Sequence, residues 1–345
     1  MSKNSKPIII WLFTGAVLVF IMTAIGGITR LTESGLSMVD WKLIMGAIPP
    51  LTEEAWQRTF EQYQQFPEYQ ITHAHFTLTD FKSIFFWEYT HRLLGRIIGL
   101  VFIIPFVLFL IQRRISWSLF YKLLFLLFMG GFQGFLGWYM VSSGLVNEPR
   151  VSHFRLAAHL STAFFTIAYS VWLALGLMQE KDRVVLFPKS LHNLTWVGLI
   201  LLAIQIVFGA FVAGKDAGMI HNFWPNMNPG EFISPEVFGG NSIWNNLINH
   251  PSGIQFMHRY IAYLVAGLVI YLWIKSKKLN TDTETQKRFS YLFILVLIQF
   301  SLGVFTLIMH VPVYMGVLHQ LGALLLLLGF VYTLSWHKPI STQKY

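Results

Sequence analysis

The chain has 345 residues, of which 54% are hydrophobic and only 12% are charged. A soluble domain carries about a quarter charged residues, and here the apolar residues gather in runs of about 20, the length that crosses a bilayer. The sequence therefore predicts a polytopic membrane protein. The formal net charge is +9, but the basic residues fall in short loops where lipid headgroups and topology account for them, so we expect no nucleic-acid partner.

The chain contains no cysteine. This excludes disulfides, zinc-thiolate sites, iron–sulfur ligation and thiol catalysis. Any metal must be held by His, Met, Tyr or carboxylate side chains. No Arg- and Ser-rich transit segment precedes the first apolar run, which favours a bacterial inner membrane over an organelle.

Eight apolar segments predict an all-α protein with eight transmembrane helices. They cover about 8–29, 84–111, 119–141, 153–178, 192–213, 254–274, 289–310 and 314–336. The two termini and the loops on their side hold 15 Lys and Arg residues, whereas the opposite loops hold seven. Because basic residues stay in the cytoplasm, we expect both termini there.

Two of the predicted outer loops are long, about 30–83 and 214–253. The first contains an acidic, aromatic stretch from Trp56 to Tyr69 that favours a surface helix. Long loops are usually functional or disordered, and the aromatic residues favour order.

The two halves of the chain carry matching motifs. His91-Arg92 matches His258-Arg259, Gln133-Gly-Phe-Leu-Gly137 matches Gln299-Phe-Ser-Leu-Gly303, and His159-Leu160 matches His319-Gln320. With four spans per half, both copies keep one orientation in the membrane. We therefore expect two duplicated four-helix bundles, residues 1–180 and 181–345.

The four repeat-related histidines are His91, His159, His258 and His319. Each lies on an even-numbered span about six residues from its outer end, which places all of them about 10 Å below the outer surface. The residue four positions after each histidine is small, Gly95, Ala163, Ala262 and Ala323, which leaves room for a flat macrocycle. Two facing imidazoles per bundle suit two bis-histidine hemes.

Other interpretations of these histidines stay open. Small residues pack transmembrane helices together, and His can hydrogen-bond between them. Zinc would need three or four ligands that converge on one point. Histidines without a repeat partner are interpreted as loop or interfacial residues, and His73-Ala-His75 has only a weak metal-binding pattern.

Glu88 lies one helical turn outward from His91, and its counterpart in the second half is Gln255. An acid in one half only suggests a reactive site in that half and an electron-transfer site in the other. The alternative is an ion pair with Arg92 at i, i+4. Arg92, Arg96 and Arg259 are candidates to pair with heme propionates, or to snorkel to the interface.

These motifs resemble heme A synthases, membrane enzymes that oxidise a methyl group of heme O to the formyl group of heme A. The resemblance covers nearly the whole chain and includes Thr29-Arg-Leu-Thr-Glu-Ser-Gly-Leu-Ser-Met38, Trp87-Glu-Tyr-Thr-His91-Arg92, Arg155-Leu-Ala-Ala-His159 and Met257-His258-Arg259. Some members carry a cysteine pair in the first outer loop. This chain has none and is similar to the mitochondrial type with a long first loop.

The resemblance implies that His91 and His159 flank the substrate heme O, and that His258 and His319 ligate heme b. It implies two successive oxygenations to a gem-diol that loses water, with Glu88 as base or as electrostatic stabiliser of a cationic intermediate. The expected partners are membrane lipid, an unidentified electron acceptor or donor, and the enzyme that makes heme O; a homo-oligomer is also open.

Two other function classes compete with this interpretation. A diheme b-type cytochrome, such as a quinol dehydrogenase subunit, would bind two hemes but leave Glu88 unexplained. A transporter with paired repeats would predict broken helices at mid-membrane, whereas the charged motifs here lie near the outer surface.

Overall fold

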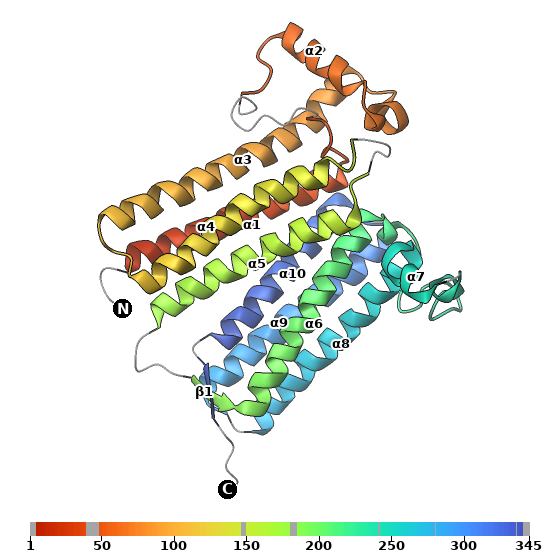
Figure 1. The fold of residues 1–345 in the computed structure, drawn as a ribbon. Coiled ribbons are helices and arrows are strands. Elements are labelled where there is room, and N and C mark those ends of the chain that lie inside the picture. Colours follow the sequence, from red (N-terminus) through yellow and green to blue (C-terminus); the bar gives the residue numbers. More distant parts are fainter. Residues whose placement is uncertain are drawn as a thin grey trace. The chain divides into compact units, whose positions relative to one another are not determined.

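The computed structural model describes residues 5–38, 48–145, 150–179, 185–240, 242–279, 281–335 and 337–340. Within them it has eight helices long and apolar enough to cross a membrane, which confirms the predicted number. They are α1 (Lys6–Leu31), α3 (Leu78–Ile111), α4 (Trp117–Val141), α5 (His153–Met178), α6 (Lys189–Gly214), α8 (Pro251–Lys278), α9 (Thr283–Ile308) and α10 (Val313–Leu334) (Figure 1).

Two helices begin about two turns earlier than predicted, because their first turns are polar but well capped. The α3 helix begins at Leu78, where Thr77 and Asp80 form a capping box. The α9 helix begins at Thr283, where the Asp282 side chain accepts a hydrogen bond from the Thr285 amide. A cap extends a helix beyond the apolar pattern, so hydrophobicity marks the membrane-crossing part and not the helix end.

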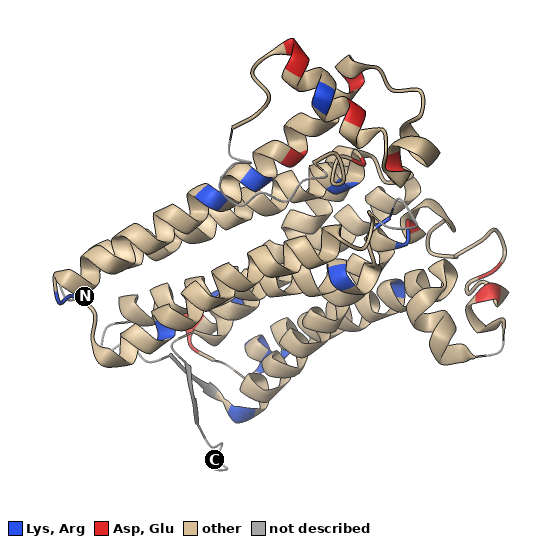
Figure 2. Cartoon of the chain, turned by 45° about the horizontal axis from the view of Figure 1, so that its top comes forward, with Lys and Arg blue, Asp and Glu red and all other residues tan. Residues whose placement is uncertain are grey.

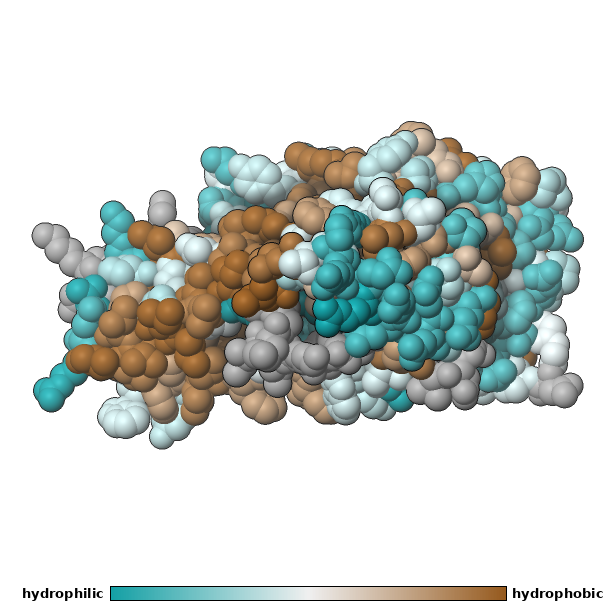
Figure 3. All heavy atoms as spheres, turned by 90° about the horizontal axis from the view of Figure 1, so that it is seen from above, coloured by the Kyte–Doolittle hydropathy of each residue, from teal (hydrophilic) through white to brown (hydrophobic). Residues whose placement is uncertain are grey.

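The apolar side chains of these helices largely face outward. In α3 only 6% of the most apolar window is buried, and large hydrophobic residues such as Ile104, Leu108 and Phe128 are exposed. Charged residues gather near helix ends and in loops (Figure 2), and broad hydrophobic areas cover parts of the surface seen from above (Figure 3). Outward apolar side chains of this kind suit contact with lipid.

The chain clusters into two compact units, Val17–Ala163 and Met1–Ala16 with Phe164–Tyr345. In the second unit α6 contacts α8, α8 contacts α9, α9 contacts α10 and α10 contacts α6, which closes a four-helix ring. The predicted division at 180 and 181 falls outside the described residues and stays a prediction.

The second unit also contains short elements. Two strands, β1 (Val185–Pro188) and β2 (His337–Ile340), pair in parallel, with Val185 opposite His337. The loop between α6 and α8 contains two 3₁₀ turns, η3 (Ala217–Met219) and η4 (Pro235–Phe238), and the helix α7 (Ile243–Asn249). This long outer loop is therefore ordered where it is described.

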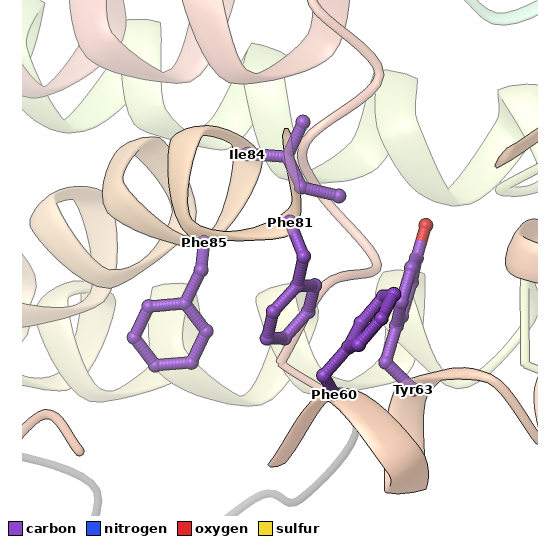
Figure 4. Packing of buried hydrophobic residues seen from close by; sticks show 5 residues of the cluster. All are labelled: Phe60, Tyr63, Phe81, Ile84 and Phe85. Atoms are coloured by element: carbon purple, nitrogen blue, oxygen red, sulfur yellow. The ribbon is translucent and has the colours of Figure 1, made fainter. Parts of the chain in front are cut away.

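The loop between α1 and α3, the first of the two predicted outer loops, folds onto the start of α3. Its aromatic stretch forms α2 (Glu53–Tyr63) and the π-helix η2 (Glu68–His73), in line with the predicted surface helix. A cluster of buried side chains joins α2 to α3. Its members are Phe60, Tyr63, Phe81, Ile84 and Phe85 (Figure 4), and further aromatic rings pack at its edge. Burial of this size anchors the loop to the first turns of α3.

A polar network lies beneath this cluster. The Tyr63 hydroxyl is 3.0 Å from Glu68 Oε2 and 2.7 Å from His73 Nδ1, and His73 Nε2 lies 3.7 Å from Glu33 Oε2. Burial raises the pKa of Glu68 to about 8, and burial lowers the pKa of His73. Both side chains are therefore neutral at pH 7, as buried groups in a network prefer to be.

The raised pKa of Glu68 predicts a loop that loosens in mild alkali. Glu68 ionises near pH 4.5 when the loop is unfolded and near 8 when it is folded, so the folded loop binds the extra proton. Its stabilising effect is full below about pH 4.5 and is lost as pH rises through about 8. We expect the protection factors of the amides in residues 53–77, which correct the exchange rates for intrinsic base catalysis, to fall between about pH 7 and 9.

Glu68→Gln mimics the protonated acid and should flatten this pH dependence. His73 is neutral throughout that range and does not contribute to the change. An identical pH dependence in the wild type and in Glu68→Gln would show that Glu68 does not carry the effect.

Candidate functional site

Two of the predicted histidines face each other within the second unit. His258 on α8 and His319 on α10 have ring centroids 6.1 Å apart, with ring planes at 85°. An imidazole nitrogen binds a metal at about 2 Å, so two rings on opposite sides of one metal have centroids about 6 Å apart. The observed spacing fits one iron between the two rings.

Both rings pack against a glycine on the preceding helix. A Cβ added to Gly209 on α6 would lie 3.1 Å from His258 Cε1, and one added to Gly303 on α9 would lie 2.8 Å from His319 Cε1. A side chain at either position would push the ring away. Glycine here lets a helix backbone approach the imidazole, as small residues do between membrane helices.

A glutamine one turn before each glycine holds the same histidine. Gln205 Nε2 lies 3.1 Å from His258 Nδ1 and donates to the His258 carbonyl at 2.8 Å. Gln299 Nε2 lies 3.1 Å from His319 Nδ1 and donates to the His319 carbonyl at 3.0 Å. The Oε1 atoms of both amides are buried without a hydrogen-bond partner among the described residues.

The first unit contains the other two predicted histidines, His91 on α3 and His159 on α5. The carboxamide of Gln133 on α4, in the orientation that satisfies its donors and acceptors, donates to His159 Nδ1 at 3.1 Å and to the His159 carbonyl at 3.2 Å. This is the contact that Gln205 and Gln299 make in the other unit.

His91 has a different neighbour. By the repeat, Met22 on α1 takes the position of Gln205, and Gly26 takes that of Gly209. A Cβ added to Gly95 would meet Met22 Cε at 3.2 Å, and one added to Gly26 would meet His91 Nε2 at 3.1 Å. The small residue four positions after His91 thus makes room for a side chain from the preceding helix, an occupant that the macrocycle interpretation did not include.

Glu88 is buried and joins α3 to the first outer loop. Its Oε2 accepts hydrogen bonds of 2.7 Å from the Ser37 hydroxyl and 2.7 Å from the Met38 amide, and its Oε1 pairs with Arg92. Arg92 also donates to the Met38 carbonyl at 2.8 Å. The ion pair considered as an alternative is therefore present, as part of a larger contact between helix and loop.

Gln255 makes the corresponding contact with opposite polarity. Its Nε2 donates to the Ala217 carbonyl at 2.7 Å and to the Ile220 carbonyl at 2.5 Å, while Arg259 donates to Gln255 Oε1 at 3.5 Å and to the Phe223 carbonyl. An amide suffices to hold a loop at this position. A buried carboxylate in the first unit therefore exceeds what loop attachment requires, since burying a charge is costly.

The structure gives contacts for some of the remaining predicted site residues. Arg92 and Arg259 bind loop carbonyls, so their pairing with propionates stays a prediction, as does that of Arg96. Among the histidines without a repeat partner, His221 binds Asn228 at 2.7 Å and Ser252 at 3.0 Å, which is a structural role. Within the described ranges no three His, Asp or Glu side chains could hold a metal together, so the zinc interpretation gains no support.

Sequence reasoning missed the glutamines that hold the histidines. The signal was present as Gln-x₃-Gly on a helix that precedes a histidine-bearing helix, at Gln133, Gln205 and Gln299. Gln133 and Gln299 are matching positions of the two halves in the sequence, but the sequence does not show which side chain each glutamine contacts.

Comparisons with known proteins agree with this geometry. Residues 9–331 match the COX15-CtaA family model, described as cytochrome oxidase assembly protein. A protein named heme A synthase from Flavobacterium psychrophilum is 51% identical over 335 residues, 96% of this chain and 98% of its own length. Its namesake from Flavobacterium johnsoniae is 50% identical and covers 97% and 98%. Another, from Parvibaculum lavamentivorans, is 42% identical and covers 93% and 91%.

The matched residues span all eight membrane helices and all four histidines, so the chain belongs to the COX15-CtaA family of cytochrome oxidase assembly proteins.

Proposed function

We propose that this chain is a heme A synthase, which oxidises a methyl group of heme O to a formyl group. The observation that carries the proposal is the difference between two similar histidine pairs, because among the described residues a buried carboxylate, Glu88, lies beside the His91 pair and none lies beside the His258 pair. The relatives named heme A synthase match over nearly the full length of both chains. These relatives are named as heme A synthases, so their names do not support the alternative of a diheme electron-transfer cytochrome.

The two pairs take different groups. His91 and His159 flank the substrate heme O, and His258 and His319 hold heme b. The fit of the second pair rests on the 6.1 Å ring spacing and on the close approach of Gly209 and Gly303. Heme b supplies one-electron transfer when bound. The matching contacts in the two units support the duplicated four-helix arrangement.

Glu88 acts on the substrate as a fixed negative charge. Oxidation at the methyl carbon passes through a cationic centre: in each of two rounds two electrons and a proton leave the carbon, the electrons go to the electron acceptor, and water adds with loss of a second proton. The resulting gem-diol loses water to form the aldehyde. Both carboxylate oxygens of Glu88 already accept hydrogen bonds, which limits the lone pairs open to a substrate proton. Of the two roles considered, this favours electrostatic stabilisation over general base catalysis.

The protein lies in the inner membrane of a bacterium with both termini in the cytoplasm. The excess of Lys and Arg in the terminal segments and their neighbouring loops supports this orientation. An electron acceptor or donor and the enzyme that supplies heme O are the partners that such a reaction requires.

Mutation should separate the two heme sites. We expect His258→Ala or His319→Ala to deplete heme b from purified protein, because each removes an iron ligand. His91→Ala or His159→Ala should retain heme b and lower heme A formation. Pyridine hemochrome spectra and heme chromatography measure both quantities. Equal loss of one and the same heme in all four variants would contradict the division into two sites.

Reporter fusions test the orientation. Fusions after Lys278 and at the C-terminus should give cytoplasmic signals, whereas fusions near Gln65 and Pro229 should give extracytoplasmic signals. Opposite signals at Gln65 and Pro229 would require an odd number of crossings between them. That result would break the parallel repeat and the matched depth of the histidines.

Glu88→Gln tests the catalytic carboxylate. The change removes the charge but places an amide N–H among donors, so it also weakens the contact with Ser37 and Met38. We expect heme O to bind and heme A yield to fall by about 100-fold or more, comparable to the loss of one electrostatic donor in other enzymes. The once-oxidised alcohol should accumulate.

Ser37→Ala is the matched control, because it removes one hydrogen bond from Glu88 and keeps the charge. It should lower heme A yield much less than Glu88→Gln does. Equal losses in the two variants, at equal protein levels, would reduce Glu88 to a loop anchor. A wild-type yield in Glu88→Gln would remove it from the mechanism.

A further inference from the structure

Three of the four histidines are held by a glutamine from the preceding helix. Gln133, Gln205 and Gln299 each place the amide nitrogen 3.1 Å from Nδ1 of one histidine. The same amide donates to that histidine's own carbonyl, so it fixes ring and backbone together. We call this contact the glutamine clamp. An amide that lies against the ring and also holds the backbone carbonyl keeps the imidazole in one orientation, and the orientation of a ligand imidazole affects its hold on a metal.

His91 lacks this clamp. By the repeat, Met22 is the residue that corresponds to Gln205, and its terminal methyl group packs against the Gly95 position. Methionine is flexible and donates no hydrogen bond. No side chain in the described part of the chain donates a hydrogen bond to the His91 ring.

The His91 ring also has a different orientation from the rings of His258 and His319. A Cβ on Gly26 would meet its Nε2 at 3.1 Å and its Cδ2 at 3.4 Å, whereas a Cβ on Gly209 or Gly303 would meet the Cε1 of its histidine first. A different edge of the imidazole, Nε2–Cδ2, thus faces the preceding helix. Without a clamp, rotation of His91 costs no hydrogen bond, so the ring can exchange between orientations.

The histidine without a glutamine clamp, His91, lies in the unit where heme O is proposed to be oxidised. A resident electron-transfer iron keeps both ligands, whereas the iron of a substrate heme must gain and lose its ligands whenever the substrate enters and leaves. Glu88 lies one turn from His91 on the same helix.

We propose, resting on the proposed function, that His91 is the exchangeable ligand of the substrate heme and that His159 is the permanent one. Met22 is the positioning residue that makes His91 exchangeable. Gln205 and Gln299 keep His258 and His319 bound throughout.

Carbon monoxide binding tests the proposal, because carbon monoxide binds reduced heme only where a ligand leaves. Detergent-purified full-length protein is loaded with heme O, reduced and mixed with carbon monoxide, and the binding rate is read from the absorption spectrum. In the wild type we expect one of two hemes to react. Met22→Gln, which installs the missing clamp, should slow the reaction by about tenfold or more, in the range of contacts behind metal ligands.

Met22→Leu is the matched control and should keep the wild-type rate. Gln299→Met should make the second heme reactive as well. In each variant, retained heme b reports a folded protein. His91→Gly should keep heme O in a five-coordinate form, bound through His159, whereas His159→Gly should lose heme O. These two variants test which histidine is the permanent ligand even if Met22→Gln does not fold.

Two outcomes would overturn the inference. Equal rates in wild type, Met22→Leu and Met22→Gln would exclude a role for the clamp, and loss of heme O from His91→Gly but not from His159→Gly would reverse the assignment. A wild type that never binds a second heme contradicts the proposed function, and this inference with it. If a second heme binds but carbon monoxide binds at equal rates in wild type, Met22→Leu and Met22→Gln, only this inference is contradicted.

Discussion

The structure depends on how polar groups are satisfied inside apolar helices. An imidazole in a membrane helix needs a hydrogen-bond partner or a metal, since water is absent there. The amides of Gln133, Gln205 and Gln299 meet this need. They also join each histidine-bearing helix to its predecessor at the level of the ring, so the same contact packs the helices and aims the ligands.

The two units use this plan with different residues at two positions. Gln205 corresponds to Met22, which changes how firmly a histidine is held. Gln255 corresponds to Glu88, which replaces an amide by a carboxylate where the outer loop meets the helix. At these two positions the first unit lacks one glutamine contact and carries a charge that the second unit lacks. We propose that this divergence gives the two units different tasks.

The sequence was sufficient for features that follow from hydrophobicity and repetition. Eight membrane helices could be predicted because apolar runs of bilayer length have few alternatives, and the pairing of His258 with His319 could be predicted from the repeat. The early start of α3 was missed because it depends on the Thr77 cap. The clamps were missed because Gln-x₃-Gly indicates a contact only when the neighbouring helix is known, and the Ser37 and Met38 donors to Glu88 lie 50 residues or more away in sequence.

The central claim is that one histidine pair holds a substrate and the other a resident cofactor. Extraction and chromatography of the hemes, after expression in cells that supply heme O, test it most directly. The account predicts that expression of this chain produces heme A and that the purified protein contains heme b. Heme b alone, with no heme A formed in the presence of heme O, would contradict it and would instead match an electron-transfer cytochrome.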